Sequence, residues 1–114
     1  MSDRNINEID LRPKWLEMIQ KILTVHLPET EVIAYGSRVT GTGHEGSDLN
    51  LVVRNRHNPV MPVRNLAEVR GAFSESNIPI LVDILDWARI SDSFREEIER
   101  VGVVVFSGEV RKQA

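Results

Sequence analysis

The stretch AYGSRVTGTGHEGSDLNLVV, residues 34–53, decides the fold that this sequence predicts. A short apolar run ends at Gly36 and Ser37, a glycine-rich segment follows, and Asp48 opens a second apolar run. Backbone N–H groups at the start of a helix that follows such a turn point toward one place and favour an anion such as a phosphate. The stretch therefore predicts a phosphate-binding turn that faces an acidic strand.

Residues 48–53 form the predicted acidic strand. Its alternation places Asp48 and Asn50 side by side on one face, while leucine and valine residues on the other face pack into the core. A later apolar run over 78–85 predicts a strand that carries Asp83, and an ionised carboxylate there is costly unless it is paired or bound to a metal. Together these oxygen donors predict a site for a hard divalent cation such as Mg²⁺.

The other apolar patterns predict helices over 10–27, 63–76 and 93–102 and strands over 31–35 and 103–106, with a polar loop over 54–62. We expect Asp10 to cap the first helix, Pro13 to lie in its first turn, and Ser93 with Glu96 to form a capping box. Asp86 is expected on the strand face opposite Asp83, as a turn or capping residue. This order predicts an α/β or α+β fold in which helices pack on one small mixed sheet.

Composition limits the function. With 114 residues we expect a single domain over 1–114, flexible at 1–9 and 107–114. The chain has no cysteine for a disulfide or thiolate site, and no apolar run long enough to span a membrane, so we expect a cytoplasmic protein without membrane association. A net charge of −3 disfavours general nucleic-acid binding, although five basic residues could form a local basic surface: Arg54, Arg56, His57, Arg64 and Arg70.

The motif Gly36-Ser37, ten residues, Asp48-Leu49-Asn50 resembles the Gly-Ser, x10, Asp-x-Asp signature of the minimal nucleotidyltransferases (MNT) of the DNA polymerase beta superfamily. The likeness continues through residues 78–87 and 90–103, so it covers about 15–106. It implies a polymerase beta-like nucleotidyltransferase fold.

The resemblance also implies roles for particular residues. Asp48 and Asp83 would be catalytic and would hold Mg²⁺ together with Asn50, while Gly36, Ser37 and Arg38 would bind the nucleoside triphosphate. Arg38 could equally pair with an acid at the rim of the sheet. Many proteins of this type accompany a HEPN-domain RNase toxin and act as its antitoxin by transferring AMP from ATP to a tyrosine of the toxin.

Asn50 departs from the signature, because a second carboxylate is expected at this position. The asparagine amide oxygen can bind a metal ion but brings no charge, so the site holds two formal negative charges instead of three. The sequence therefore leaves two functions open: an active Mg²⁺-dependent nucleotidyltransferase that modifies a toxin, or a degenerate binding module that acts by forming a complex. A third reading is that the asparagine was introduced to trap a substrate complex. The choice between a homo-oligomer and a hetero-oligomer is also open.

Overall fold

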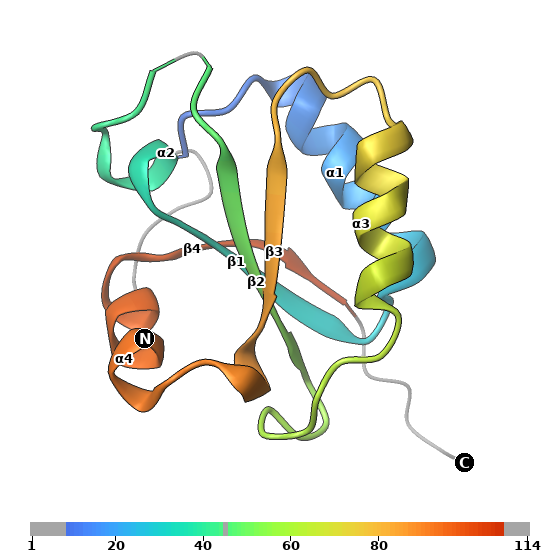
Figure 1. The fold of residues 1–114 in the computed structure, drawn as a ribbon, viewed down its shortest axis with the longest axis vertical. Helices are drawn as coiled ribbons and strands as arrows, with labels where there is room; N and C mark the ends of the chain where they lie inside the picture. Colours follow the sequence, from blue (N-terminus) through green and yellow to red (C-terminus); the bar gives the residue numbers. More distant parts are fainter. Residues whose placement is uncertain (1–8, 45, 109–114) are drawn as a thin grey trace.

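The computed structural model describes residues 9–44 and 46–108 (Figure 1). In chain order the elements are α1 (Pro13–His26), β1 (Thr30–Tyr35), α2 (Ser37–Thr40), β2 (Leu49–Asn55), α3 (Leu66–Glu75), β3 (Val82–Asp86), the 3₁₀ turn η2 (Trp87–Arg89), α4 (Asp92–Val101) and β4 (Val103–Ser107). The predicted α/β class, with helices packed on one small mixed sheet, is confirmed.

The four strands form one sheet in the order β3-β2-β1-β4. β2 pairs in parallel with β3, whereas β1 pairs antiparallel with both β2 and β4. Tyr35 is the register partner of Asn50, and Asn50 is the register partner of Asp83. Three neighbouring strands therefore bring these residues into one row on the same face of the sheet.

The two faces of the sheet are covered differently. α1 and α3 lie beside each other in Figure 1, and the main core packs between them and one sheet face. On the other face a smaller cluster gathers around Ile33, Val52, Trp87 and Ile98, the last of these from α4. The row that contains Asn50 lies on this second face, and its Tyr35 end packs against the smaller cluster.

The helix interiors agree with the predicted apolar stripes, but the helix starts do not. Ile19 and Leu23 of α1 are fully buried, and Pro13 occupies the first turn as predicted, but the N-cap is Arg12 and the expectation for Asp10 was wrong. α3 begins three residues late, at Leu66. The residue before it, Asn65, has φ 69° in the left-handed region, so the right-handed helix does not continue through it to residue 63.

α4 also begins differently from the prediction. Its N-cap is Ser91, whose hydroxyl accepts from the N–H of Phe94 at 3.2 Å, and the helix begins at Asp92. The capping box predicted at Ser93 and Glu96 is therefore wrong, since Ser93 already lies inside the helix. Gly102 ends the helix as expected.

All four strands have other limits than predicted, β1 and β4 by one residue each. β2 continues through residues assigned to a loop, because Arg54 faces Glu31 of β1 across the strand pair and binds its carboxylate. β3 begins only at Val82, after the segment that contains Pro79, whose missing N–H weakens a ladder.

Three residues that were predicted to belong to flexible tails, Ile9, Ser107 and Gly108, are part of the fold. Ile9 belongs to the main core, Ser107 ends β4, and the buried Gly108 donates its N–H to the Thr30 carbonyl at 2.8 Å. The remaining residues of both predicted tails lie outside the described part of the chain.

In each of the two outer strands, β3 and β4, a backbone carbonyl accepts a hydrogen bond from a helix side chain. Arg70 of α3 donates to the Ile84 carbonyl of β3 at 3.0 Å, and Gln20 of α1 donates to the Val105 carbonyl of β4 at 3.0 Å. Bonds of this kind occupy sheet edges that would otherwise pair with another strand. None of the helices within the described ranges is long and apolar enough to cross a membrane.

Candidate active site

The row formed by Tyr35, Asn50 and Asp83 is the centre of the candidate site. Neighbouring strands lie about 4.8 Å apart, so the Asn50 and Asp83 side chains leave the sheet side by side. Asp83 is exposed although it stands in an apolar run, since β3 is an outer strand and α4 does not cover this end. Exposure removes the desolvation cost that was expected for its carboxylate.

Gly36 brings the glycine-serine turn against this row. Its backbone has φ 87°, and a Cβ atom at this position would lie 2.7 Å from the Asn50 Nδ2 atom. Only glycine fits here, because the backbone conformation disfavours other residues and there is no room for a side chain. The turn and the second predicted metal position are therefore packed directly together.

Ser37 opens α2, a single helical turn. The N–H groups of Val39 and Thr40 donate to the Gly36 carbonyl at 3.0 Å each, and the Ser37 carbonyl accepts from Gly41 and Gly43. The first N–H groups of such a turn have no partner within the helix and face outward from its start. This geometry suits the phosphate contact that the sequence predicts for Gly36 and Ser37.

Asp48 is exposed and immediately precedes β2, two residues before Asn50. The residue before it, Ser47, is held in place by bonds on both sides. Its N–H donates to the His44 carbonyl at 3.0 Å, and its own carbonyl accepts from Arg38 Nε at 2.9 Å. The position of Asp48 therefore depends on this fixed loop end.

Arg38 was predicted to contact phosphate or an acid at the sheet rim. In the structure its side chain is buried, with 3% of its surface exposed. Besides the Ser47 carbonyl, it binds the Asp10 carbonyl through Nη1 at 2.7 Å, and its guanidinium lies 5.9 Å from the centre of the Trp15 ring. These contacts join the loop to the segment before α1.

Tyr35 belongs to the site, although the sequence did not single it out. Burial, and to a lesser degree the negative charge of Asp83, raises the pKa of the Tyr35 hydroxyl to about 12. Phe94 of α4 packs edge-on against the ring, with 5.4 Å between the ring centres. Its position in the sequence could have indicated this, because Tyr35 ends the strand directly before Gly36.

The donors available to a metal ion are few. Within residues 9–44 and 46–108 no group of three or more histidine, aspartate or glutamate side chains is placed to hold one. The candidate ligands are therefore the Asp48 and Asp83 carboxylates and the Asn50 amide oxygen. All three are oxygen donors of the kind that Mg²⁺ accepts, so this set fits the ion with less charge than three carboxylates would supply.

Other acids and bases noted in the sequence lie apart from this set. Asp86 is buried and accepts from the N–H groups of residues 63 and 88 at 3.0 and 3.1 Å, which confirms its capping role. His44 is exposed, and its Nδ1 accepts from the Gly46 N–H. Glu45 lies outside the described residues.

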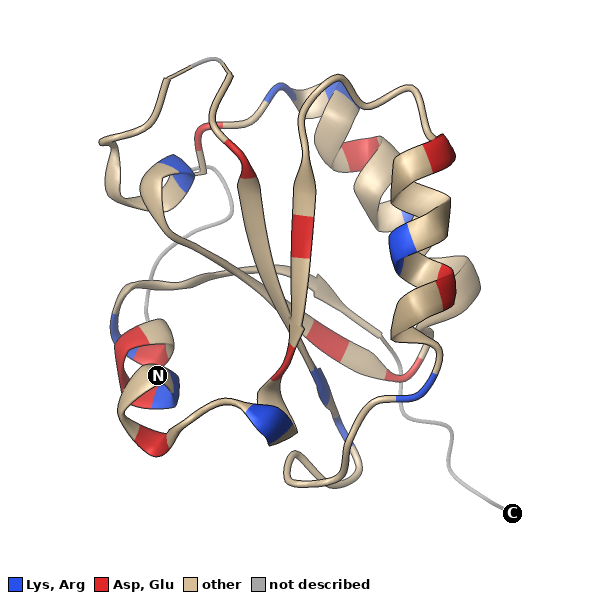
Figure 2. Ribbon diagram, in the orientation of Figure 1, with Lys and Arg blue, Asp and Glu red and all other residues tan. Residues whose placement is uncertain are grey.

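The expected basic surface is largely engaged within the chain. Arg54 binds Glu31 and lies 3.5 Å from Glu99, Arg56 binds the Ser107 hydroxyl and the Gly108 carbonyl, and His57 lies 3.4 Å from Glu29. Figure 2 shows acidic residues interspersed with basic ones on α3 and α4. With Arg70 on the Ile84 carbonyl, four of the five basic residues are thus held by contacts within the chain.

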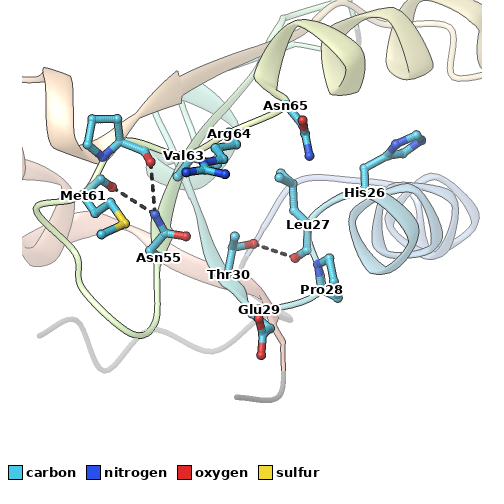
Figure 3. A pocket seen from close by; sticks show the side chains of 11 residues that line it. His26, Leu27, Pro28, Glu29, Thr30, Asn55, Met61, Val63, Arg64 and Asn65 are labelled. Carbon is cyan, nitrogen blue, oxygen red and sulfur yellow. Dashed lines mark hydrogen bonds between the residues drawn. The ribbon is translucent and has the colours of Figure 1, made fainter. Parts of the chain in front are cut away.

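A pocket lies at the opposite end of the strands from this site (Figure 3). It is lined by residues that include Thr30 and Asn55, which pair at the far end of β1 and β2 from Tyr35 and Asn50. Its volume of about 240 Å³ is below the usual size of a small-molecule site. Its lining contains none of the predicted site residues.

Comparison with known proteins gives a matching sequence profile, a relative and two similar structures. The sequence profile described as "Poly(A) RNA polymerase, mitochondrial-like, central palm domain" matches residues 2–108. The "Probable protein adenylyltransferase MntA" of Haemophilus influenzae is 39% identical over 100 residues, which are 86% of this chain and 84% of that protein. A crystal structure of a toxin-antitoxin with AMP-PNP shares the fold, with a TM-score of 0.65 and 22% identity over 82% of this chain and 74% of the other. A mutant MntA-HpeT toxin-antitoxin structure also has a TM-score of 0.65, with 21% identity and the same coverage.

Proposed function

Because this chain belongs to the family of mitochondrial-like poly(A) RNA polymerase central palm domains and is a nucleotidyltransferase related to MntA, we propose that it transfers AMP from ATP to a partner protein. The partner is a HEPN-domain toxin, for which the chain acts as antitoxin, and the reaction requires Mg²⁺. The family predicted from the glycine-serine turn and the spaced acidic strand is confirmed.

The observation that carries the proposal is the register of the central strands. Asn50 lies beside Asp83 in the parallel pair, and Gly36 packs against Asn50 from the other side. A triphosphate at the Gly36-Ser37 turn would therefore stand next to the oxygen donors of β2 and β3. Phosphoryl and nucleotidyl transfer depends mainly on such positioning and on neutralisation of charge.

In the proposed reaction the acceptor hydroxyl oxygen forms a bond to the α-phosphorus of ATP. The bond from that phosphorus to the bridging oxygen breaks, pyrophosphate leaves, and the hydroxyl proton passes to Asp83 or to water. Mg²⁺, when held by Asp48, Asn50 and Asp83, would neutralise the charge of the phosphates. Asp83 is exposed at the outer strand, where an acceptor on a partner protein can reach it.

The relatives support the choice of donor and acceptor. The Haemophilus influenzae relative is named a protein adenylyltransferase, and one structural neighbour was crystallised with AMP-PNP as a toxin-antitoxin. The open sheet face also suits a protein acceptor better than a small molecule, because an enclosed pocket is the usual site for small ligands.

The test is transfer of label from α-labelled ATP to the candidate toxin in the presence of Mg²⁺. We expect labelling by the wild-type chain and a loss of more than about a hundredfold in Asp83→Ala. Asp92→Ala is the matched control, because Asp92 is an exposed acid on α4 whose ion pair with Arg95 lies outside the site. Undiminished labelling by Asp83→Ala would refute the role of Asp83.

Asn50 favours a second candidate, a degenerate member of the family that acts by forming a complex. The described residues supply two carboxylates and one amide, which weakens metal binding. Asn50→Asp discriminates between the two. If the natural chain is inactive and Asn50→Asp gains labelling, the degenerate function is correct; if both label the partner equally, it is refuted.

A further inference from the structure

Arg38 is a charged side chain that the proposed chemistry does not explain. Removing a guanidinium from water is costly unless its N–H groups find acceptors. Here Nε donates to the Ser47 carbonyl and Nη1 to the Asp10 carbonyl, two segments that are far apart in the chain. The Asp10 N–H in turn donates to the Arg38 carbonyl at 2.7 Å, so Arg38 and Asp10 are bonded in both directions.

These bonds link the two halves of the candidate site. Arg38 itself belongs to α2, directly after Gly36 and Ser37, and its Nε holds the loop end at Ser47, directly before Asp48. The same loop is tied to α2 a second time, where the Gly43 N–H donates to the Ser37 carbonyl at 3.2 Å. The Arg38 side chain therefore bridges the glycine-serine turn and the residue before Asp48, and this bridge limits how far apart the turn and the Asp48 carboxylate can lie.

From this geometry we infer that Arg38 is a positioning residue that fixes Asp48 relative to the Gly36-Ser37 turn, and that it is not a phosphate ligand. The inference rests on the proposed function, since it assigns Asp48 to the metal. Its planar, forked guanidinium reaches the two carbonyls from two different nitrogens, Nε and Nη1, whereas all the donors of a lysine ammonium are on one nitrogen. Arg38→Lys therefore keeps the positive charge and removes the fork.

The chain offers a matched control for this substitution. Arg56 also joins two groups, the Ser107 hydroxyl and the Gly108 carbonyl, and it lies beyond the opposite end of β2. Arg56→Lys makes the same chemical change far from Asp48. An effect of Arg38→Lys that Arg56→Lys does not share is thus specific to the site.

The experiment compares wild type, Arg38→Lys and Arg56→Lys by three measurements. Hydrogen exchange by NMR follows the N–H groups of Gly43 and Ser47, calorimetry with Mn²⁺ alone measures metal affinity, and calorimetry with ATP in EDTA measures metal-free nucleotide affinity. For Arg38→Lys we expect faster loop exchange and Mn²⁺ binding weakened by about tenfold to a hundredfold, as for other residues that orient metal ligands. Metal-free ATP affinity should be unchanged, because a positioning residue does not contact the phosphates, and Arg56→Lys should match wild type throughout.

Three results would overturn the inference. Unchanged loop exchange in Arg38→Lys would show that Arg38 does not hold the loop. Faster loop exchange with unchanged Mn²⁺ affinity would show that the loop does not determine the position of the Asp48 carboxylate. A large loss of metal-free ATP affinity with unchanged loop exchange would make Arg38 a phosphate ligand. Absence of Mn²⁺ binding in the wild-type chain would instead count against the proposed function, while loop exchange would still decide whether Arg38 holds the loop.

Discussion

Gly36→Ala tests whether the glycine-serine turn is packed against Asn50 as tightly as the structure shows. Gly36 has φ 87°, and an added Cβ atom would lie 2.7 Å from the Asn50 Nδ2 atom. Both features should destabilise the alanine variant, one through backbone strain and the other through steric overlap. The two contributions can be separated, because the chain contains a glycine that has only the first.

That glycine is Gly41, which has φ 82° and no atom within 4 Å of an added Cβ. Gly41→Ala should therefore cost the backbone strain alone, about 1–2 kcal/mol of the free energy of unfolding. Gly36→Ala adds an overlap, for which overpacking in well-packed sites suggests about 1–3 kcal/mol. Gly36 has ψ −157°, a region that is almost restricted to glycine and costs other residues about 1–3 kcal/mol, so the total for Gly36→Ala is about 2–6 kcal/mol.

Urea unfolding followed by circular dichroism measures these costs. Adding Asn50→Ala removes the overlapping atoms, so the Gly36→Ala cost in that background should fall by a coupling free energy of about 1–3 kcal/mol and leave the backbone strain of Gly36 alone. The reasoning is refuted if Gly36→Ala costs no more than Gly41→Ala, or if the Gly36 and Asn50 substitutions are additive. Either result would mean that the Gly36-Ser37 turn is not in close steric contact with the Asn50 side chain.

Further predictions concern single side chains. Tyr35 is the only tyrosine, so an ultraviolet titration should give a pKa of about 12, and Asp83→Asn should lower it; a wild-type value near 10 would contradict this. Because burial favours the neutral phenol, its contribution to stability is complete below pH 10 and is lost as the pH rises from 10 to about 12, which urea unfolding at several pH values will show. Asp86→Ala removes a buried acceptor of two backbone N–H groups and should cost about 2–4 kcal/mol in urea unfolding without changing Mn²⁺ affinity. Arg70→Ala frees the Ile84 carbonyl at the sheet edge and should raise concentration-dependent association in sedimentation experiments, whereas Lys21→Ala should not.

The periodic apolar patterns predicted the element types well because they depend on which face of each element is buried. Ile19 and Leu23 are fully buried on the predicted helix stripe, and Leu49 and Leu51 on the predicted strand face. Helix starts depend instead on local competition between capping groups. Two serines stand near the start of α4, and the structure uses Ser91, while Arg95 binds the Trp87 carbonyl and fixes the helix after η2.

The candidate site was predictable in its residue types but not in its packing. Alternation alone predicts that Asp48 and Asn50 share a strand face, whereas the parallel pairing that puts Asp83 beside Asn50 is a property of the folded sheet. The resemblance to a nucleotidyltransferase supplied that link. The burial of Arg38 could not be inferred, because its acceptors come from Asp10 and Ser47, and no sequence pattern marks a carbonyl as an acceptor for a distant arginine.

The place of Asn50 in the row explains how a neutral residue can suit the fold while it lowers the charge of the proposed metal site. An aspartate there would stand beside the Asp83 carboxylate, and two charges about 5 Å apart repel by about 1–3 kcal/mol at the effective dielectric of a protein surface. The amide removes this repulsion, so Asn50→Asp should lower the free energy of unfolding without metal by a similar amount. With saturating Mg²⁺ the order should reverse, because the ion binds the three-carboxylate site more tightly and stabilises the folded state by mass action. Urea unfolding in EDTA and in Mg²⁺ measures both effects. Equal Mg²⁺ stabilisation of the two proteins would mean that residue 50 is not a metal ligand.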